Sequence, residues 1–390
     1  MRQLSLLSAF VFSILLSFIT QAADIPPPPI LGVKSYLLVD FNSNHIIAQQ
    51  AGTSRVEPAS LTKLMTAYLV FKALKNGNLQ LDQTLPVSTK ALRGGGTGCG
   101  GSLGSCMFLD PKQPVTVDEL LHGMIVISGN DASIALAEGI ADSEQAFADL
   151  MNKEAVRLGM KSTHFVNVTG LSDPQHYTTA FDLSLLAAAL IHDFPDQYKR
   201  FYSIKEYTYN KITQLNRNRL LWLDPYIDGM KTGHTESAGY CLISSAKRGE
   251  TRLISVVLGA PSESSRASES QRLLNYGFQF YESHLVYKRG QTVSTLKIWK
   301  GIDDTLSATV TDDLYIMLPK GEYARLKAKM SSKQPLIAPI DAGQEIGTIQ
   351  FLLNGKVIDQ RNLVAAEKVE VAGIFGRMWD SIKLLFRATR

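Results

Sequence analysis

The chain has 390 residues, of which 45% are hydrophobic and 19% are charged. This balance excludes a disordered protein, and the length allows two or three domains. The formal net charge of +4 is small for the length, and no basic run with interleaved aromatic residues occurs. Composition therefore excludes an extended nucleic-acid-binding surface, and we expect no nucleic-acid partner.

The N-terminus, residues 1–23, is typical of a secretory signal peptide. Arg2 supplies a positive charge, an apolar stretch runs from Leu4 to Ile19, and small residues end at Ala23. This arrangement favours cleavage over a retained membrane anchor, because the apolar run is short for a membrane span. We expect the mature chain to begin near Ala23 or Asp24 and to work outside the cytoplasm.

Residues 24–284 are predicted to form one α+β domain. Strand patterns stand at both ends of this region, and long helical patterns lie between them. Such an order places N- and C-terminal strands in a shared sheet. The expected strands cover 35–41, 44–49, 206–209, 240–246 and 252–259, and the expected helices start at Ser60 or cover 131–141, 144–158, 179–191 and 264–281.

Residues 285–370 are predicted to form a small all-β domain. Short alternating runs, separated by Gly, Asp and Pro, begin near residue 286. This spacing is typical of closely connected strands. The expected strands lie at 294–299, 307–310, 314–318 and 348–353, and no catalytic cluster occurs among them.

The last segment, residues 371–390, is predicted to form an amphipathic helix. Apolar and aromatic residues repeat at the helical period, and mostly basic residues fall opposite. This pattern indicates a helix lying on a membrane surface, and the alternative is a terminal helix packed on its own domain. The apolar set is Val371, Ile374, Phe375, Met378, Trp379, Ile382, Leu385 and Phe386, and the polar set is Arg377, Asp380, Lys383 and Arg387.

The three cysteines do not indicate a metal site. Cys99 and Cys106 flank a Gly/Ser-rich stretch, where an oxidising compartment would let them pair, and two free thiols are the alternative. No histidine or further cysteine stands nearby at ligand spacing. Cys241 lies in a strand-like run and is expected to be buried. We expect no metal and no cofactor.

Three polar clusters could carry chemistry. Ser60 opens a helical pattern, and Lys63 lies one turn further on the same face, so Ser60 is either a helix cap or a nucleophile with an adjacent base. Ser128-Gly129-Asn130-Asp131 stands at a loop-to-helix junction, and Lys231-Thr232-Gly233-His234 follows a turn at Asp228-Gly229 and precedes a strand. Each cluster is weak evidence alone, but all three are expected at the ends of elements, where loops present catalytic groups.

Taken in order, the three clusters resemble the motifs of the penicillin-binding protein and serine β-lactamase superfamily. The segments Pro58-Ala-Ser-Leu-Thr-Lys63, Gln214-Leu-Asn-Arg217-Asn and Asp228-Gly-Met-Lys-Thr-Gly-His234-Thr235 narrow the resemblance to low-molecular-mass D-alanyl-D-alanine carboxypeptidases. The similarity covers nearly the whole chain. It implies a transpeptidase-like domain with an antiparallel sheet and helices, then the β-rich domain and the anchoring helix. It also implies a peripheral location on the periplasmic side of the inner membrane.

The resemblance implies a role for each motif residue. Ser60 would be the nucleophile and Lys63 its base, with a pKa lowered by burial and by the ammonium of Lys231. Ser128 would relay a proton to the departing D-alanine, and Asn130 would orient Lys63 and donate to a substrate amide. In the family, a loop at the position of the Gly-rich segment 94–102 lies beside the active site, but the cysteine-flanked Gly run departs from the family pattern.

The remaining motif residues would hold the substrate. Lys231 and Thr232 would bind its terminal carboxylate. The oxyanion hole would use the N–H of Ser60 and one that follows Gly233, near His234, which is expected to orient and not to act as a base. Two further residues would face the carboxylate or, alternatively, form surface salt bridges: Arg217 and Arg266.

The expected function is a serine-type carboxypeptidase that removes the terminal D-alanine of peptidoglycan stem pentapeptides through an acyl-serine, with β-lactams as inhibitors. Within the superfamily, the alternatives are a β-lactamase or a D,D-endopeptidase. The β-rich domain and the tail disfavour the β-lactamase, which ordinarily lacks both. A catalytically silent cell-wall binding module is the alternative from another class, and it would reduce the motifs to helix caps.

Overall fold

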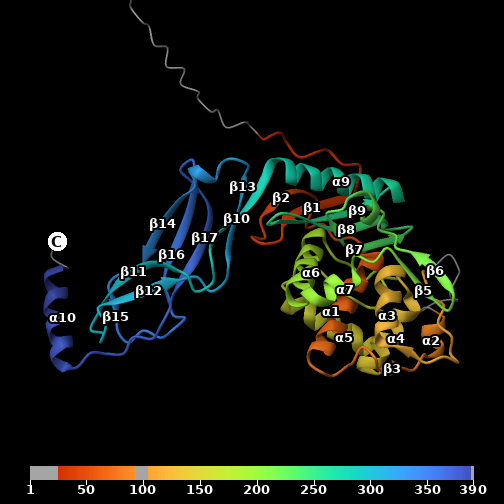
Figure 1. The fold of residues 1–390 in the computed structure, drawn as a ribbon, viewed down its shortest axis with the longest axis horizontal. Helices are drawn as coiled ribbons and strands as arrows, with labels where there is room; N and C mark the ends of the chain where they lie inside the picture. The colour runs from red at the N-terminus through yellow and green to blue at the C-terminus, as the bar shows by residue number, and fades with distance from the viewer. Residues whose placement is uncertain (1–24, 94–103, 388–390) are drawn as a thin grey trace, which may run out of the picture.

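The computed structural model describes residues 25–93 and 104–387. The expected signal peptide and Cys99 lie outside these residues, so the cleavage site and the pairing of Cys99 with Cys106 stay predictions. Figure 1 shows two lobes joined in series, with the helix-rich lobe formed by the first part of the chain and the strand-rich lobe by the second.

A five-stranded antiparallel sheet organises the first lobe, with strand order β2-β1-β9-β8-β7. The N-terminal hairpin therefore pairs with strands from the end of the domain, as the sequence predicts. The strands are β1 (Ser35–Asp40), β2 (Ile46–Gln50), β7 (Ile227–Thr235), β8 (Gly239–Arg248) and β9 (Thr251–Ala260).

The sheet is buried on both faces, which explains its nearly continuous apolar strands. In β9, Ile254 and Val256 join the core beneath the helical cluster, whereas Leu253 and Val257 join the core beneath helix α9. Side chains alternate across a strand, so one apolar run supplies both cores.

The helices of the first lobe are α1 (Lys63–Lys75), α2 (Thr89–Leu92), α3 (Val117–His122), α4 (Asn130–Ala141), α5 (Glu144–Arg157), α6 (Ala180–Asp193), α7 (Pro195–Phe201), α8 (Leu220–Leu223) and α9 (Glu263–Phe280).

The first α-helix begins later than expected. Ala59–Thr62 form a 3₁₀ turn, η1, and regular α-helix α1 starts only at Lys63. Ser60 makes no capping hydrogen bond, so the interpretation of Ser60 as a helix cap was wrong. The first lobe also contains two short strand pairs, which are β3 (Thr84–Leu85) with β4 (Val115–Thr116), and β5 (Glu206–Tyr209) with β6 (Ile212–Leu215).

The Lys231 cluster also lies differently from our expectation. Residues Asp228 to His234 all belong to β7, so Asp228-Gly229 is not a turn before a strand. β7 is the last strand in the order and pairs with β8 on one side. The polar residues of this segment hid the strand, because a sequence pattern cannot distinguish a polar edge strand from a loop.

The second lobe is all-β, as predicted. Its main sheet has the order β14-β16-β17-β12-β11-β15, and a separate pair joins β10 and β13. A third core fills this lobe, with Phe351 and Leu363 fully buried. The strands are β10 (Tyr281–Tyr287), β11 (Thr292–Trp299), β12 (Thr305–Thr309), β13 (Leu314–Pro319), β14 (Lys327–Ser332), β15 (Leu336–Ile337), β16 (Glu345–Leu353) and β17 (Lys356–Ala365), with a 3₁₀ turn at Tyr323–Arg325.

The lobes meet where β10 begins. Met317 of β13 packs into the core of the first lobe, and the Ser283 hydroxyl donates to Asp40 of β1 at 3.1 Å. β10 runs across residue 284, where we expect the first domain to end, and the domain limits stay a prediction.

The predicted C-terminal helix is present as α10 (Ile374–Arg387). It lies at the end of the second lobe that is remote from the first lobe (Figure 1). Its apolar side chains face solvent: Phe375 is 85% exposed and Trp379 is 61% exposed. Within the part of the chain that the structure describes, none of the helices combines the length and apolar character needed to cross a bilayer.

Candidate active site

The Ser60 turn is the centre of the candidate site. Ala59, the residue before Ser60, has φ +49°, a left-handed conformation that residues other than glycine adopt rarely. Gly170 packs against this turn so closely that a Cβ at its position would lie 1.8 Å from the Ala59 carbonyl oxygen. The conformation of the turn is therefore held by a neighbouring loop, and it places Ser60 in a partly buried position.

Lys63 is completely buried and makes three contacts through Nζ. The ammonium nitrogen lies 3.0 Å from Ser60 Oγ, 2.8 Å from Asn130 Oδ1 and 2.7 Å from the carbonyl oxygen of Thr169. Burial, followed by the charge of Arg217, lowers the pKa of Lys63 to about 7. The side chain next to the serine can therefore lose its proton near neutral pH.

Asn130 begins α4, and Ser128, two residues earlier, is left-handed with φ +68°. The turn before it, Gly123–Ile127, is a π-helical turn, a feature often found at functional sites. The Asn130 N–H donates to the Ser105 carbonyl at 2.7 Å, and a Cβ at Gly104 would lie 2.3 Å from Asn130 Nδ2. The segment at 104–106 thus lies against the amide that contacts Lys63.

Strand β7 passes directly beside the Ser60 turn. A Cβ at Gly233 would lie 3.2 Å from the Ser60 amide nitrogen and 3.1 Å from the Pro58 carbonyl oxygen, so glycine permits this approach. Two residues earlier, Lys231 is buried and donates to the Thr232 carbonyl at 3.1 Å. Burial lowers the pKa of Lys231 well below its ordinary value, and the charges of Lys63, Arg217 and Arg266 lower it further.

Three residues assigned through the resemblance lie around β7. His234 is exposed and stacks on Tyr240 with ring centroids 4.0 Å apart. Arg217 is exposed, and its positive charge acts on both lysines. Arg266 is buried in α9, where its guanidinium donates to Glu263 at 2.8 Å and to the Arg217 carbonyl at 3.3 Å. Arg266 therefore also holds the main chain of Arg217.

The loop that contains residues 167–170 contributes groups to the site that the motifs do not reveal. Besides the Thr169 carbonyl on Lys63, the Val168 carbonyl accepts from Thr66 Oγ1 at 2.9 Å. Asn167 Oδ1 accepts the N–H of Gly170 at 2.7 Å and shapes the loop. The signal available in the sequence was Asn167-Val-Thr-Gly170, a side-chain turn followed by glycine. A main-chain oxygen carries no residue-type signal, so its role could be found only from the fold.

The first comparison concerns protein families. Residues 22–262 match the peptidase S11 family, described as D-alanyl-D-alanine carboxypeptidase. This match covers more than half of the 390 residues. The chain belongs to the peptidase S11 family of D-alanyl-D-alanine carboxypeptidases. Residues 281–371 match a second family, the C-terminal domain of penicillin-binding protein 5.

Individual relatives agree with the family. The chain is 41% identical to D-alanyl-D-alanine carboxypeptidase DacC of Escherichia coli over 388 residues, which are 99% of this chain and 96% of the relative. Among solved structures, penicillin-binding protein 5 from Haemophilus influenzae is 39% identical with a TM-score of 0.84, covering 88% of this chain and 99% of that one. Penicillin-binding protein D2 from Listeria monocytogenes, in its ampicillin-bound form, is 31% identical with a TM-score of 0.58 and covers 65% of this chain and 100% of that one.

These comparisons confirm several predictions made from the sequence. The low-molecular-mass penicillin-binding protein family, the two-part fold and the serine carboxypeptidase class of enzyme are confirmed. The β-lactamase and D,D-endopeptidase alternatives are not favoured, because the close relatives are named carboxypeptidases. The roles of the individual site residues are not tested by these comparisons and stay proposals.

Proposed function

We propose that Ser60 attacks the terminal peptide bond of a D-alanyl-D-alanine stem peptide and forms an acyl-enzyme, with Lys63 as its base. The observation that carries this proposal is the set of three contacts around Lys63 Nζ. A neutral amine has two N–H groups and one lone pair, whereas an ammonium has three N–H groups. The identity of the three partners decides which form the site accommodates.

Two of the three partners can only accept a hydrogen bond. Asn130 Oδ1 and the Thr169 carbonyl oxygen, at 2.8 and 2.7 Å, take the two N–H groups of a neutral amine. The remaining lone pair then points to the Ser60 hydroxyl at 3.0 Å, which can donate. The pKa of about 7 makes the neutral form accessible. This arrangement supports transfer of the serine proton to Lys63 as Oγ attacks the carbonyl carbon.

The other motif residues are proposed to stabilise and position the reacting groups. The N–H of Ser60 and the N–H of His234 would donate to the oxyanion, since Gly233 brings β7 within contact of the Ser60 turn. Ser128 would return a proton to the departing D-alanine, and the amide of Asn130 would also donate to the peptide.

Positive charge near β7 supports recognition of a free carboxylate. Lys231, Thr232, Arg217 and Arg266 would form the region that binds the C-terminal carboxylate of the substrate. Burial, followed by the charges of Lys63, Arg217 and Arg266, lowers the pKa of Lys231, so an incoming anion would be attracted and would restore the charge of Lys231. We therefore propose a peptidoglycan pentapeptide as substrate and β-lactams as inhibitors that acylate the same serine.

Labelling with a fluorescent penicillin tests this proposal. The wild-type chain should be labelled covalently and should release D-alanine from a pentapeptide that ends in D-Ala-D-Ala. Ser60→Ala should lose both activities while it keeps the unfolding temperature of the wild type. Equal labelling of Ser60→Ala would refute the assignment of Ser60 as the nucleophile, and rapid loss of the label without D-alanine release would instead indicate a β-lactamase.

We further propose that α10 holds the enzyme on the periplasmic face of the inner membrane. The exposed apolar side chains of α10 support this location, because no other element of the described chain covers Phe375 or Trp379, which remain 85% and 61% exposed. Arg377 and Lys383 would meet anionic headgroups. The position of α10 in Figure 1 would keep the Ser60 lobe away from the bilayer surface.

A further inference from the structure

We propose that His176 is a positioning residue. Through Thr62, it fixes the turn that carries Ser60 relative to the loop that binds Lys63. This inference rests on the proposed roles of Ser60 and Lys63 and adds a group that none of the motifs contains. His176 is 1% exposed and lies in the loop before α6. It makes one hydrogen bond with each of its two ring nitrogens.

The two hydrogen bonds define the form of the His176 ring. Nδ1 accepts the N–H of Val166 at 3.1 Å, so the ring proton must be on Nε2. Nε2 lies 2.8 Å from Thr62 Oγ1, to which it donates. Burial lowers the pKa of His176 to about 4, with smaller effects from the nearby charges of Asp173, His164 and Glu57. The neutral ring with a proton on Nε2 is therefore the form that fits this site.

Thr62 connects the His176 ring to the turn that carries Ser60. Because Oγ1 accepts from His176, its own hydrogen is free to donate to the Ala59 carbonyl oxygen at 2.8 Å. Ala59 has the left-handed φ of +49° and immediately precedes Ser60. The hydrogen-bonded series His176–Thr62–Ala59 thus holds the strained residue that sets the direction of the Ser60 side chain and N–H.

The same loop also positions the base. Val166, which His176 holds from one side, is three residues before Thr169, whose carbonyl accepts from Lys63 at 2.7 Å. Gly170, next in the chain, packs on the Ala59 carbonyl. His176 therefore connects the loop that binds the base to the turn that carries the nucleophile. Its loss should change the distance and direction between Ser60 and Lys63 without removing either residue.

The test compares acylation by a fluorescent penicillin in variants of the full chain. Thr62→Val keeps the shape of the side chain and removes the hydroxyl, whereas Thr62→Ser keeps the hydroxyl. His176→Asn keeps an acceptor for Val166 and removes the bond to Thr62. We expect Thr62→Val and His176→Asn to lower the first-order acylation rate constant by about tenfold to a hundredfold, with little change in the preceding binding constant. Thr62→Ser should stay within about threefold of wild type.

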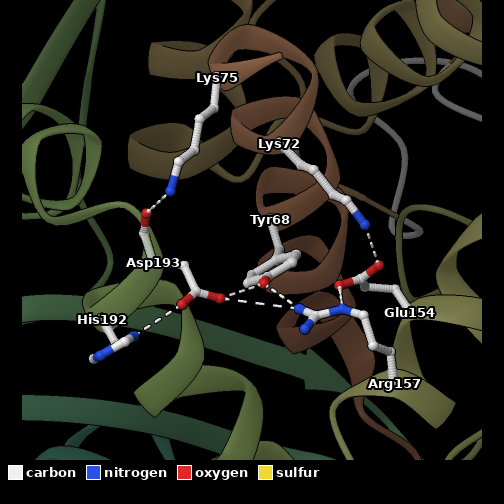
Figure 2. Close-up of polar contacts among 7 residues, drawn as sticks. All are labelled: Tyr68, Lys72, Lys75, Glu154, Arg157, His192 and Asp193. Atoms are coloured by element: carbon white, nitrogen blue, oxygen red, sulfur yellow. Dashed lines mark hydrogen bonds and ion pairs between the residues drawn. The ribbon is translucent and has the colours of Figure 1, made fainter. Parts of the chain in front are cut away.

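A combined variant and a control separate positioning from general stability. Thr62→Val/His176→Asn should acylate no more slowly than the slower single variant, because both changes interrupt the same series. Tyr68→Phe serves as the control, since Tyr68 lies on α1 but its hydroxyl bonds to Asp193 and Arg157 (Figure 2) and to none of the residues of the Ser60 turn. This control should lower the unfolding temperature and leave the acylation rate constant within about twofold of the wild-type value.

Two outcomes would overturn the inference. The first is a wild-type acylation rate constant in both Thr62→Val and His176→Asn. The second is a change that affects only the binding constant, or a fall in the acylation rate constant that Tyr68→Phe reproduces when it lowers the unfolding temperature equally. If Ser60→Ala were also labelled, the proposed function itself would fail. If Ser60 is required but Thr62→Val is fully active, only the role of His176 fails.

Discussion

The Nζ atom of Lys63 lies 3.0 Å from the Oγ atom of Ser60, across one turn at the junction of η1 and α1. The serine belongs to a 3₁₀ turn with a left-handed residue before it, and the lysine begins a regular helix. The contact therefore depends on the change from one helix type to the other. It also depends on a loop more than a hundred residues later, which supplies the Thr169 carbonyl.

The first prediction concerns the oxygen that Asn130 offers to Lys63. Asn130→Asp replaces a neutral acceptor at 2.8 Å with a carboxylate. A negative charge at this distance stabilises the ammonium and raises the pKa of Lys63, so the neutral base forms only at higher pH. We expect the midpoint of the acylation profile to move upward by about one pH unit or more, with a loss of about tenfold or more at pH 7.

The profile should be measured with a fluorescent penicillin between about pH 6 and about pH 10. Asn130→Ala is the matched control, because it removes the acceptor without adding charge and should slow acylation without the same upward shift. An unchanged midpoint in Asn130→Asp would contradict the assignment of Lys63 as the titrating base.

The second prediction concerns Arg217 and the substrate carboxylate. Arg217→Gln should raise KM for a peptide that ends in a free D-alanine carboxylate by about tenfold, since a charge-assisted hydrogen bond contributes about 1.5–3 kcal/mol. The same variant should change little for the corresponding peptide amide, which wild type should process poorly. Arg219→Gln, two residues further and also exposed, is the control. Equal losses on acid and amide peptides would show that Arg217 does not recognise the carboxylate.

A third prediction concerns the polar cluster that joins α1, α5 and α6 (Figure 2). Glu154 is buried, and its carboxylate lies 2.8 Å from Lys72 Nζ and 2.5 Å from Arg157 Nε. The side chains of Lys72 and Arg157 are 43% and 52% exposed, so solvent weakens each pair. We expect Glu154→Gln to lower the free energy of unfolding by about 1–2 kcal/mol in urea denaturation.

The matched control for that change is Glu370→Gln, which removes a partner of Lys368 in an ion pair whose two side chains are both more than half exposed. Its effect should lie within about 0.5 kcal/mol of zero. Neither variant should alter acylation of Ser60. A Glu154→Gln protein as stable as wild type would contradict the view that this cluster stabilises the contacts among the three helices.

A fourth prediction concerns α10. Phe375→Ser/Trp379→Ser removes two large exposed apolar side chains and leaves the net charge unchanged. Binding to vesicles of phosphatidylethanolamine and phosphatidylglycerol should weaken by about tenfold or more, because burial of each such side chain contributes about 1.5–3 kcal/mol. D-alanine release should be unaffected.

Cosedimentation with the vesicles measures this binding. Leu223→Ser, which removes an exposed leucine from α8 in the first lobe, should bind as wild type does. If the double variant cosediments fully, or if wild type does not bind, α10 is not the membrane-binding element.

The sequence predicted the shared sheet, the long helices of the first lobe and the β-rich second lobe, because apolar periodicity reports burial directly. β9 illustrates this well, since alternate residues of one run enter two different cores. The Lys231 segment was predicted less well. Its polar residues suggested a loop, but hydrogen bonds with β8 make it an edge strand.

The site was predictable only where it consists of side chains in motifs. Ser60, Lys63 and Asn130 are brought together as their spacing and the resemblance suggested. The Thr169 carbonyl and the His176 ring were not foreseen, since both act through tertiary contacts made by a loop without a distinctive pattern. The sequence also favoured the ammonium of Lys231 as the charge that lowers the pKa of Lys63. In the structure burial lowers that pKa first, and the charge that lowers it further is that of Arg217.

The pH dependence of acylation in wild type and Lys63→Arg tests the central claim most directly. Lys63 must be neutral to accept the Ser60 proton, so the wild-type rate should rise with pH through a midpoint near 7 and then level off. Arginine stays charged at every accessible pH, so Lys63→Arg should lose acylation by about a thousandfold or more, whereas Lys72→Arg on the same helix should retain it. A wild-type rate that does not change between about pH 6 and about pH 9, or a Lys63→Arg variant within about tenfold of wild type, would contradict the account.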